Sequence, residues 1–331
     1  MKTRNFIFLC IALQSSSIFA ERFASKEDPQ IMFEAKAKVV YRFYDLPLNG
    51  KYTKDIWYAK NWKDKDRGFA KRRDGTFASE IHCPFEVLSP SEKLDLCIKK
   101  RGNSVSYAKK ELDRTDYKDR TDWAGVCDTV KSLQMMGDKP ESRMVDHIFF
   151  TNEEVFALQC LYLIDQGCSA AGIGESDEAA RGHLVNAGSF HIALANALGI
   201  QGGSFIQIPE FFDEKNPSLE REIYSELVLG FASIILEQTS NEVLINTEIS
   251  TLIEDRNGND NIVNRALTYK LELEDGNIVG GSWVSGYGGP LFMWLPHPKD
   301  LNYFEKIKDG SYIESLLGPS SPYILMCDDL L

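Results

Sequence analysis

The chain has 331 residues, of which 43% are hydrophobic and 26% charged. It is therefore long enough for one large domain or two modest ones, and its composition excludes a disordered chain and a fibrous repeat. The net charge of -12 disfavours nucleic acid as a partner, because binding to phosphates needs a basic surface.

The first residues have the order of an export signal. Lys2 and Arg4 precede an apolar run from Phe6 to Leu13, and the small residue Ala20 closes the segment. We expect this segment to be a cleaved signal peptide of a secreted or periplasmic protein; the alternative is a helix that stays and packs. The run is too short to cross a bilayer, which needs about 20 apolar residues, so no membrane span is expected.

Three domains are predicted: the signal peptide at 1–20, an N-terminal aromatic-rich wrapping segment at 21–120, and an α+β domain at 121–331. Aromatic side chains are frequent in the wrapping segment before residue 75, and packing onto a neighbouring surface is the favoured interpretation over contact with a ligand. Ser89 and Pro90 are typical of a helix start.

Two helices are predicted at the start of the third domain. Apolar residues recur every three or four positions between Val126 and Met136, which indicates a helix with one apolar face. A second helix is expected to begin at Thr151 or Asn152, whose side chains can cap it, and to end before Gly167.

The next elements carry the histidine of greatest interest. A loop at 169–187 leads into a short apolar helix, 192–198, with His191 at its start, and a strand follows at 204–208. An amphipathic helix is predicted from Leu219 to Leu236. We expect the chain then to form an antiparallel β meander, and no regular element is predicted for its final part. The strands of the meander are expected at 241–249, 265–273 and 278–284.

Six cysteines follow the signal segment: Cys83, Cys97, Cys127, Cys160, Cys168 and Cys327. Their spacing matches no zinc pattern. Cys83 and Cys97 are a candidate structural bridge, since export permits disulfides. The acidic clusters lack the spacing of a calcium loop. The sequence thus predicts no cofactor and no metal ligand.

Cys127 is the candidate nucleophile. A helix N-terminus favours a thiolate and offers free backbone amides to an oxyanion, and Gly125 permits a tight turn just before it. The alternative is a buried core cysteine. A cysteine nucleophile also needs a base. Among five histidines, His191 is the candidate because it begins a new element, although a core or surface histidine is the simpler interpretation.

Several motifs, taken in their order along the chain, resemble the transglutaminase elicitor family, known from oomycete secreted transglutaminases and bacterial relatives. The resemblance covers most of the chain after the signal segment. The motifs are Trp123-Ala-Gly-Val-Cys127, Ser189-Phe-His191 through Asn196 to Gly199, Glu242-Val243 with Asn246, and Gly276 to Trp283.

The resemblance implies a papain-like or transglutaminase-like α+β core with a helix-borne cysteine. It implies that Cys127 attacks the carboxamide of a glutamine in a protein or peptide, ammonia leaves, and an amine donor receives the acyl group from the thioester. His191 would be the general base and acid. Asn246 would orient His191, with Glu210 and Asp213 as rivals.

Three departures from the family leave other functions open. Asp128 stands where the family has histidine, and a negative charge there raises the pKa of a neighbouring thiol. The family's Trp-Asn-Gln-Pro stretch is altered around Asn246, and the chain between Ile208 and Asn241 is longer than the family's. Water as the acyl acceptor would give a cysteine protease, amidase or deamidase with the same dyad. Loss of the chemistry would leave a binding protein on the same fold.

Overall fold

The structure is a computed structural model of the whole chain. It describes residues 22–33, 37–59, 62–63, 66–76, 87–116, 126–168, 170–174, 184–209, 225–254, 260–285, 289–297 and 300–318. The predicted signal segment at 1–20, Gly125 and Trp123 lie outside these ranges.

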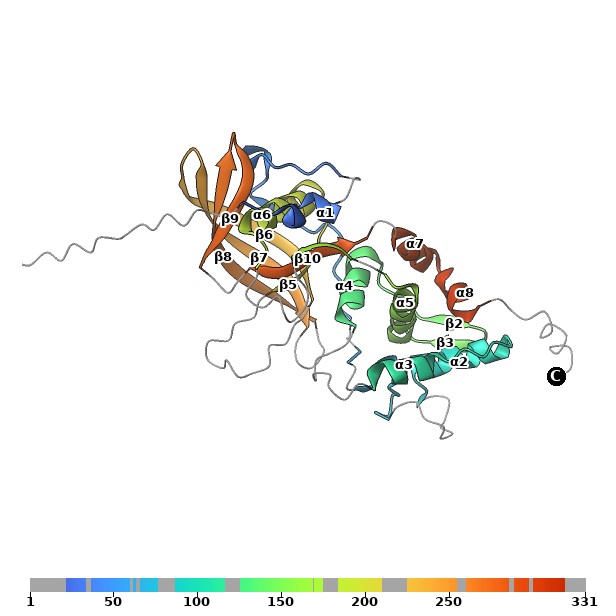
Figure 1. Cartoon of the computed structure of the whole chain (residues 1–331). Coiled ribbons are helices and arrows are strands. Elements are labelled where there is room, and N and C mark those ends of the chain that lie inside the picture. The colour runs from blue at the N-terminus through green and yellow to red at the C-terminus, as the bar shows by residue number, and fades with distance from the viewer. Residues whose placement is uncertain are drawn as a thin grey trace, which may run out of the picture.

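The described residues form a sheet lobe and a helical lobe that lie side by side (Figure 1). The sheet lobe has eight antiparallel strands in the order β4-β10-β5-β6-β7-β8-β9, with β1 paired to β6. The strands are β1 (Asn49–Lys51), β4 (Ala170–Gly174), β5 (Ile206–Pro209), β6 (Glu226–Gln238), β7 (Glu242–Glu254), β8 (Asp260–Glu274), β9 (Asn277–Ser285) and β10 (Pro290–Pro296).

The helical lobe is built around α5 (Asn152–Gln166), whose residues from Val155 to Leu163 are buried. A capping box between Thr151 and Glu154 begins this helix, and Gly167 ends it at a φ of 64°. The surrounding elements are α2 (Pro90–Lys100), α3 (Tyr107–Thr115), β2 (Arg143–Val145), β3 (Ile148–Phe150), α7 (Leu301–Asp309) and α8 (Tyr312–Leu317).

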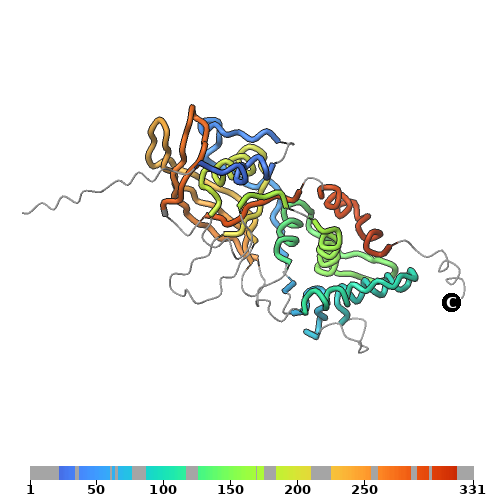
Figure 2. The backbone as a smooth tube through the Cα atoms, viewed as in Figure 1, coloured from blue at the N-terminus to red at the C-terminus, as the bar shows by residue number. Residues whose placement is uncertain are grey.

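Each lobe has its own hydrophobic core, and the N-terminal residues divide between the two. Met32 and Phe33 of α1 (Gln30–Phe33), with Phe43, belong to the sheet core. Trp57 and Phe69 belong to the helical core. The backbone tube shows this division, because the darker blue trace lies over the sheet and the cyan trace runs with the helices (Figure 2).

The helix α4 (Cys127–Met136) joins the two lobes. Its Val130 and Leu133 are buried in the helical core. Its Met135 packs with Ile206 and Leu227 of the sheet. Because α4 packs into the helical core and also against a smaller cluster on the sheet, it lies between the lobes, and its first residue contacts Ser225 just before β6.

The helix α6 (Ala187–Leu194) packs on the far end of the sheet, against β8 and β9. This contact is close: a Cβ at Gly188 would lie 2.5 Å from the carbonyl oxygen of Gly280. Only a glycine permits this approach without displacing the backbone. A π-helical turn, Ala195–Ile200, follows directly.

The predicted class, α+β with a C-terminal antiparallel meander, is confirmed, as are the helices at α4 and α5. The helix predicted from Leu219 to Leu236 is wrong. Residues 226–238 form β6, which is paired with β7 along its length and with β1 and β5 over shorter stretches. The apolar run fits a strand buried in a sheet as well as it fits a helix, and pairing on both edges decides for the strand.

The C-terminal part, for which no element was expected, supplies β10, α7 and α8. The strand β10 lies between β4 and β5 in the sheet. Its neighbours in the sheet come from distant parts of the chain, so the local sequence pattern does not predict where β10 lies in the sheet.

Candidate functional site

Cys127 is the first residue of α4 and is half-buried at the boundary between the lobes. The residue before it, Val126, has no side-chain oxygen, so no side-chain hydrogen bond caps the helix. The first amides of a helix have no partner within the helix and carry partial positive charge. They can stabilise a negatively charged oxygen formed next to the Cys127 sulfur.

Two polar side chains contact the thiol. Cys127 Sγ lies 3.7 Å from Asp128 Oδ1 and 3.8 Å from the hydroxyl of Ser225. The Ser225 hydroxyl in turn donates a short hydrogen bond to Asp128 Oδ1. Ser225 directly precedes β6, so the first turn of α4 faces the start of this strand across the lobe boundary.

These surroundings keep the thiol protonated. Burial, then the charge of Asp128, raises the pKa of Cys127 to about 12, and the more distant Glu254 adds to the increase. Hydrogen bonds from the backbone and hydroxyl of Ser225 act in the opposite direction and are outweighed. At neutral pH the thiolate is therefore a very small fraction of the total.

Replacing Asp128 with asparagine is expected to make Cys127 more reactive. The change removes the negative charge beside the thiol and keeps the shape of the side chain, so the pKa of Cys127 should fall. Each unit of decrease raises the thiolate fraction at pH 8 about tenfold. The rate of alkylation by iodoacetamide at Cys127, followed by mass spectrometry, measures this, and an unchanged rate would mean that Asp128 does not control the thiol.

His191 lies elsewhere, in the core of the sheet lobe. Its side chain is fully buried, and Nδ1 is 2.8 Å from the hydroxyl of Tyr269. Its other ring nitrogen, Nε2, has no hydrogen-bond partner. Phe43 packs against the ring at 6.0 Å between centroids. His191 therefore has the environment of a core histidine.

The structure does not bring Cys127 and His191 together. A chain of hydrogen bonds continues from Tyr269 to Thr247 at 2.7 Å and from Thr247 to Ser233 at 2.8 Å. His191 is thus connected to Ser233, whereas Cys127 contacts Ser225. These two serines are eight positions apart along the chain, or about 26 Å in an extended strand. Cys127 therefore faces the start of β6, whereas His191 is connected to a residue in the interior of this strand.

Protonation of His191 is expected to destabilise the fold in acid. Burial lowers the pKa of His191 to about 4 from 6.5. The group's contribution to stability is therefore complete above pH 6.5 and is lost as the pH falls from 6.5 to 4. The loss amounts to about 3 kcal/mol of unfolding free energy. Urea titrations between pH 7 and 4, on the wild type and on His191→Gln, would measure it as a slope that the variant lacks.

Asn246 does not reach either residue. It lies on β7, and its side-chain amide donates to the Thr268 hydroxyl at 2.9 Å. Its rivals Glu210 and Asp213 lie outside the described residues. Within the part of the chain that the structure describes, His191 is oriented by a tyrosine, and no asparagine or carboxylate contacts it.

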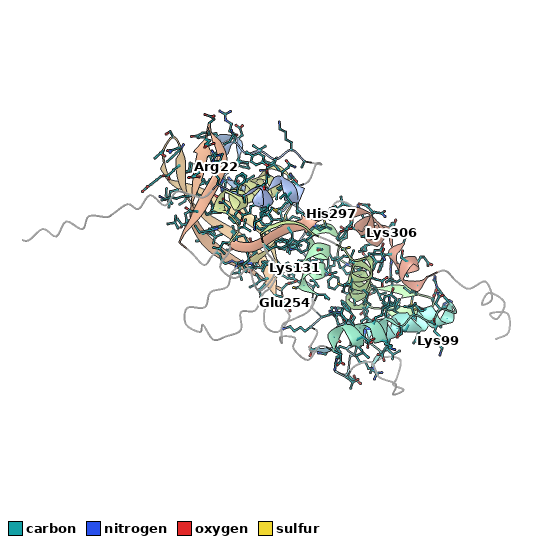
Figure 3. The ribbon with its side chains drawn as sticks, in the orientation of Figure 1. Arg22, Lys99, Lys131, Glu254, His297 and Lys306 are labelled. Carbon is teal, nitrogen blue, oxygen red and sulfur yellow. The ribbon has the colours of Figure 1, made fainter. Side chains whose placement is uncertain are left out.

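A buried ion pair fixes α4 one turn below Cys127. Lys131 Nζ lies 2.5 Å from Asp260 Oδ1, and both side chains are 1% exposed. The second oxygen of Asp260 accepts from the side chain of Gln134 and the backbone of Ala59. Figure 3 labels Lys131 and Glu254 close together where α4 meets the sheet.

The other described cysteines are free thiols. Cys97 is buried and its sulfur is 3.6 Å from the carbonyl oxygen of Val145, so it is not bridged to Cys83, which lies outside the described residues. No group of three or more histidine, cysteine, aspartate or glutamate side chains in the described ranges could hold a metal ion. No described helix is long and apolar enough to cross a membrane.

The fold resembles that of a solved enzyme. The crystal structure of the GP42 transglutaminase from Phytophthora sojae matches 83% of this chain and 91% of its own, with a TM-score of 0.58 and 18% sequence identity. The chain has a transglutaminase fold. Neither a family profile nor a curated protein sequence matches it.

Ser225 is the site residue that the sequence did not reveal. It stands just before β6, in the stretch that was expected to be helical, and a serine before a strand carries no signal of its own. Only the pairing of β6 in the sheet brings it to α4. Among the described residues, the hydrogen-bond partners of the Cys127 sulfur are the Ser225 hydroxyl and the Asp128 carboxylate, and no imidazole is one of them.

Proposed function

We propose that the protein is a cysteine acyltransferase of the transglutaminase type in which Cys127 is the nucleophile. The observation that carries the proposal is the position of Cys127: the first residue of a helix at the lobe boundary of a transglutaminase fold, with polar groups facing its sulfur. The acyl donor would be a glutamine in a protein or peptide, and the acceptor a primary amine.

The site supplies most of what the chemistry needs. The free amides of the first turn of α4 can hold the oxygen of the tetrahedral intermediate. The backbone amide of Ser225 can donate to a thiolate on Cys127, while the Ser225 hydroxyl accepts from the thiol and donates to Asp128. Asp128 Oδ1 is the nearest acceptor for the thiol proton, at 3.7 Å. In the proposed site, Ser225 and Asp128 therefore stand beside the sulfur in place of His191, which the sequence predicts as the base.

The reaction is a double displacement. The Cys127 sulfur attacks the carboxamide carbon, the carbon–nitrogen bond breaks, and the proton of the thiol leaves with ammonia. An amine then attacks the thioester, the carbon–sulfur bond breaks, and the proton returns to sulfur. The thioester divides one difficult amide exchange into two easier steps.

Incorporation of a biotinylated alkylamine into a glutamine-bearing protein such as casein, with ammonia release measured in parallel, tests the proposal. A carboxylate is a weak base for a thiol, so we expect the rate to rise about tenfold per pH unit between 7 and 10 as the thiolate fraction grows. Ammonia release without incorporation would indicate deamidation. Appearance of new N-termini would indicate a protease.

The second candidate is a binding protein that retained the fold and lost the chemistry. It is favoured by the raised pKa of Cys127, about 12. It is also favoured because no described histidine forms a hydrogen bond with the Cys127 sulfur. Absence of both ammonia release and incorporation up to pH 10, with normal folding, would select this candidate over the enzyme.

Export completes the proposal. The order of charged, apolar and small residues over positions 1–20 supports cleavage of a signal peptide and action outside the cell or in the periplasm. Sequencing the N-terminus of the protein recovered from its natural host tests this, and retention of Met1 would contradict it.

A further inference from the structure

A hollow of about 140 Å³ lies on the helical lobe, beside the first turn of α5. Four aromatic side chains line it: Trp57, Tyr58, Trp62 and Phe156. The core fixes two of them, because Trp57 and Phe156 are buried and their rings meet edge to face at 5.3 Å between centroids. Tyr58 is 59% exposed. One aromatic ring of the hollow is therefore open to solvent, although the segment that carries it packs onto the helices.

Three exposed polar side chains complete the wall of this hollow: Lys139, Asn152 and Glu153. The Lys139 ammonium group and the Glu153 carboxylate form no hydrogen bond or ion pair with any other described residue. The side-chain oxygen of Asn152 accepts from the Glu153 backbone amide at 3.0 Å, which leaves its NH2 group for a ligand. One positive and one negative charge cancel, so the charge of the wall favours an uncharged ligand.

The hollow continues into a larger one. A second hollow, of about 580 Å³, has Trp62, Asn152 and Glu153 in its wall as well. It extends past Gly75 to Pro90 at the start of α2. The two hollows together form one groove, called here the aromatic groove. Sites for drug-sized ligands have about 300–1,000 Å³, so the aromatic groove has room for several linked rings.

We propose that the aromatic groove binds an oligosaccharide made of pyranose rings with equatorial hydroxyl groups, such as a fragment of cellulose or chitin. A ring of this kind has a flat face of C–H groups and an edge of hydroxyl groups. The C–H face packs on an aromatic ring, whose π face is negative. The hydroxyl edge needs both donors and acceptors. Lys139 and Asn152 supply donors, and Glu153 supplies acceptors.

The polar wall distinguishes a sugar from a proline-rich peptide, which is another ligand of aromatic-lined grooves. Proline has no N–H, so a polyproline segment offers only acceptors. It would cover the Glu153 carboxylate without donating to it, and an unpaired charge removed from water is costly. The indole N–H of Trp57 does not serve a peptide carbonyl, because it donates to the carbonyl of Gly137 at 3.3 Å. A hydroxyl donates and accepts, so a sugar satisfies both Glu153 and Lys139.

The aromatic groove is separate from Cys127. Trp57 contacts Gly137, the residue that follows the last turn of α4. Cys127 is the first residue of that helix, about 15 Å away along its axis. Binding in the groove therefore does not depend on the thiol, and the inference goes beyond the proposed function. The groove would hold the protein on a polysaccharide whichever reaction Cys127 performs.

Calorimetric titration of the full-length protein with cellohexaose and with chitohexaose tests the proposal. We expect at least one of them to bind, and Tyr58→Ala to weaken this binding about fivefold, because it removes the exposed stacking surface. Tyr58→Phe keeps the ring and should bind nearly as the wild type does. Glu153→Ala removes a charged acceptor and should weaken binding about tenfold. The matched controls are Tyr44→Ala, at a tyrosine that is 58% exposed on the sheet lobe, and Glu305→Ala, at an exposed position of α7.

The outcomes separate the aromatic groove from the other possibilities. If neither oligosaccharide binds, or if Tyr58→Ala and Glu153→Ala bind with the wild-type affinity, the groove is not a sugar site. Binding of decaproline in place of the sugars, lost in Tyr58→Ala, would make it a peptide groove and overturn the proposal. Cys127→Ala should bind the sugar as the wild type does, and Tyr58→Ala should release ammonia at the wild-type rate. Failure of the sugar site is thus distinct from failure of the proposed function.

Discussion

Replacing Cys127 with alanine is expected to abolish both ammonia release and amine incorporation. The sulfur is the atom on which the thioester forms, so its loss removes the covalent intermediate and not only a contact. Cys127 is half-buried and its contacts are with Asp128 and Ser225. We therefore expect unfolding free energy to change by no more than about 1 kcal/mol, and a urea titration measures this beside the activity assay.

His191→Ala is the informative comparison for this prediction. The alanine leaves a cavity in the sheet core and removes a hydrogen bond from Tyr269, which should cost about 2–4 kcal/mol of unfolding free energy. The activity of the folded fraction should remain. If His191→Ala instead abolished turnover at full stability, the dyad expected from the sequence would be correct and the assignment of Asp128 and Ser225 would be overturned.

The sequence predicted the fold better than the site. Thr151 and Glu154 predicted where α5 begins, and Gly167 predicted where it ends. Apolar residues at intervals of three and four predicted α4. The meander carried alternation and an Asp275-Gly276 turn. All of these signals are local. The order of the strands in the sheet was not local, because β10 pairs with β4 and β5 from far earlier in the chain.

The error over β6 had the largest consequence for the site. A helix from Leu219 to Leu236 would contain Ser225, so the sequence predicts no contact between Ser225 and Cys127. Asn246 is assigned from the resemblance alone, and in the structure it lies on β7 and bonds Thr268. The strand that starts opposite the cysteine is β6, the one before β7 in the chain.

The role of His191 was also beyond local reasoning. The sequence predicts His191 at the start of a helix over 192–198, whereas α6 begins at Ala187 and carries His191 one turn inside, under Phe43 and against Tyr269. The close contact of Gly188 with β9 fixes this helix on the far end of the sheet. Which face of a short, uniformly apolar helix is functional depends on its neighbours, and the sequence pattern does not contain them.

Replacing Lys131 with methionine is expected to destabilise the protein by about 3–5 kcal/mol, since it leaves a buried carboxylate without its counter-charge. Asp260 is 1% exposed and keeps only the neutral donors of Gln134 and Ala59. Because this pair fixes α4 one turn below Cys127, we also expect a lower kcat with little change in KM. Guanidinium titration and kinetics on the folded fraction measure the two effects.

The double variant Lys131→Met with Asp260→Leu separates the charge from the packing. A well-packed apolar pair often matches a buried ion pair in stability, so this variant should recover most of the lost free energy. If it does, and kcat stays low, the ion pair serves to hold the register of α4 against the sheet, and with it the spacing between Cys127 and Ser225. Recovery of both stability and kcat would show that apolar packing positions the nucleophile equally well. If the double variant is no more stable than Lys131→Met, the stability lost in Lys131→Met comes from packing and not from the unpaired charge.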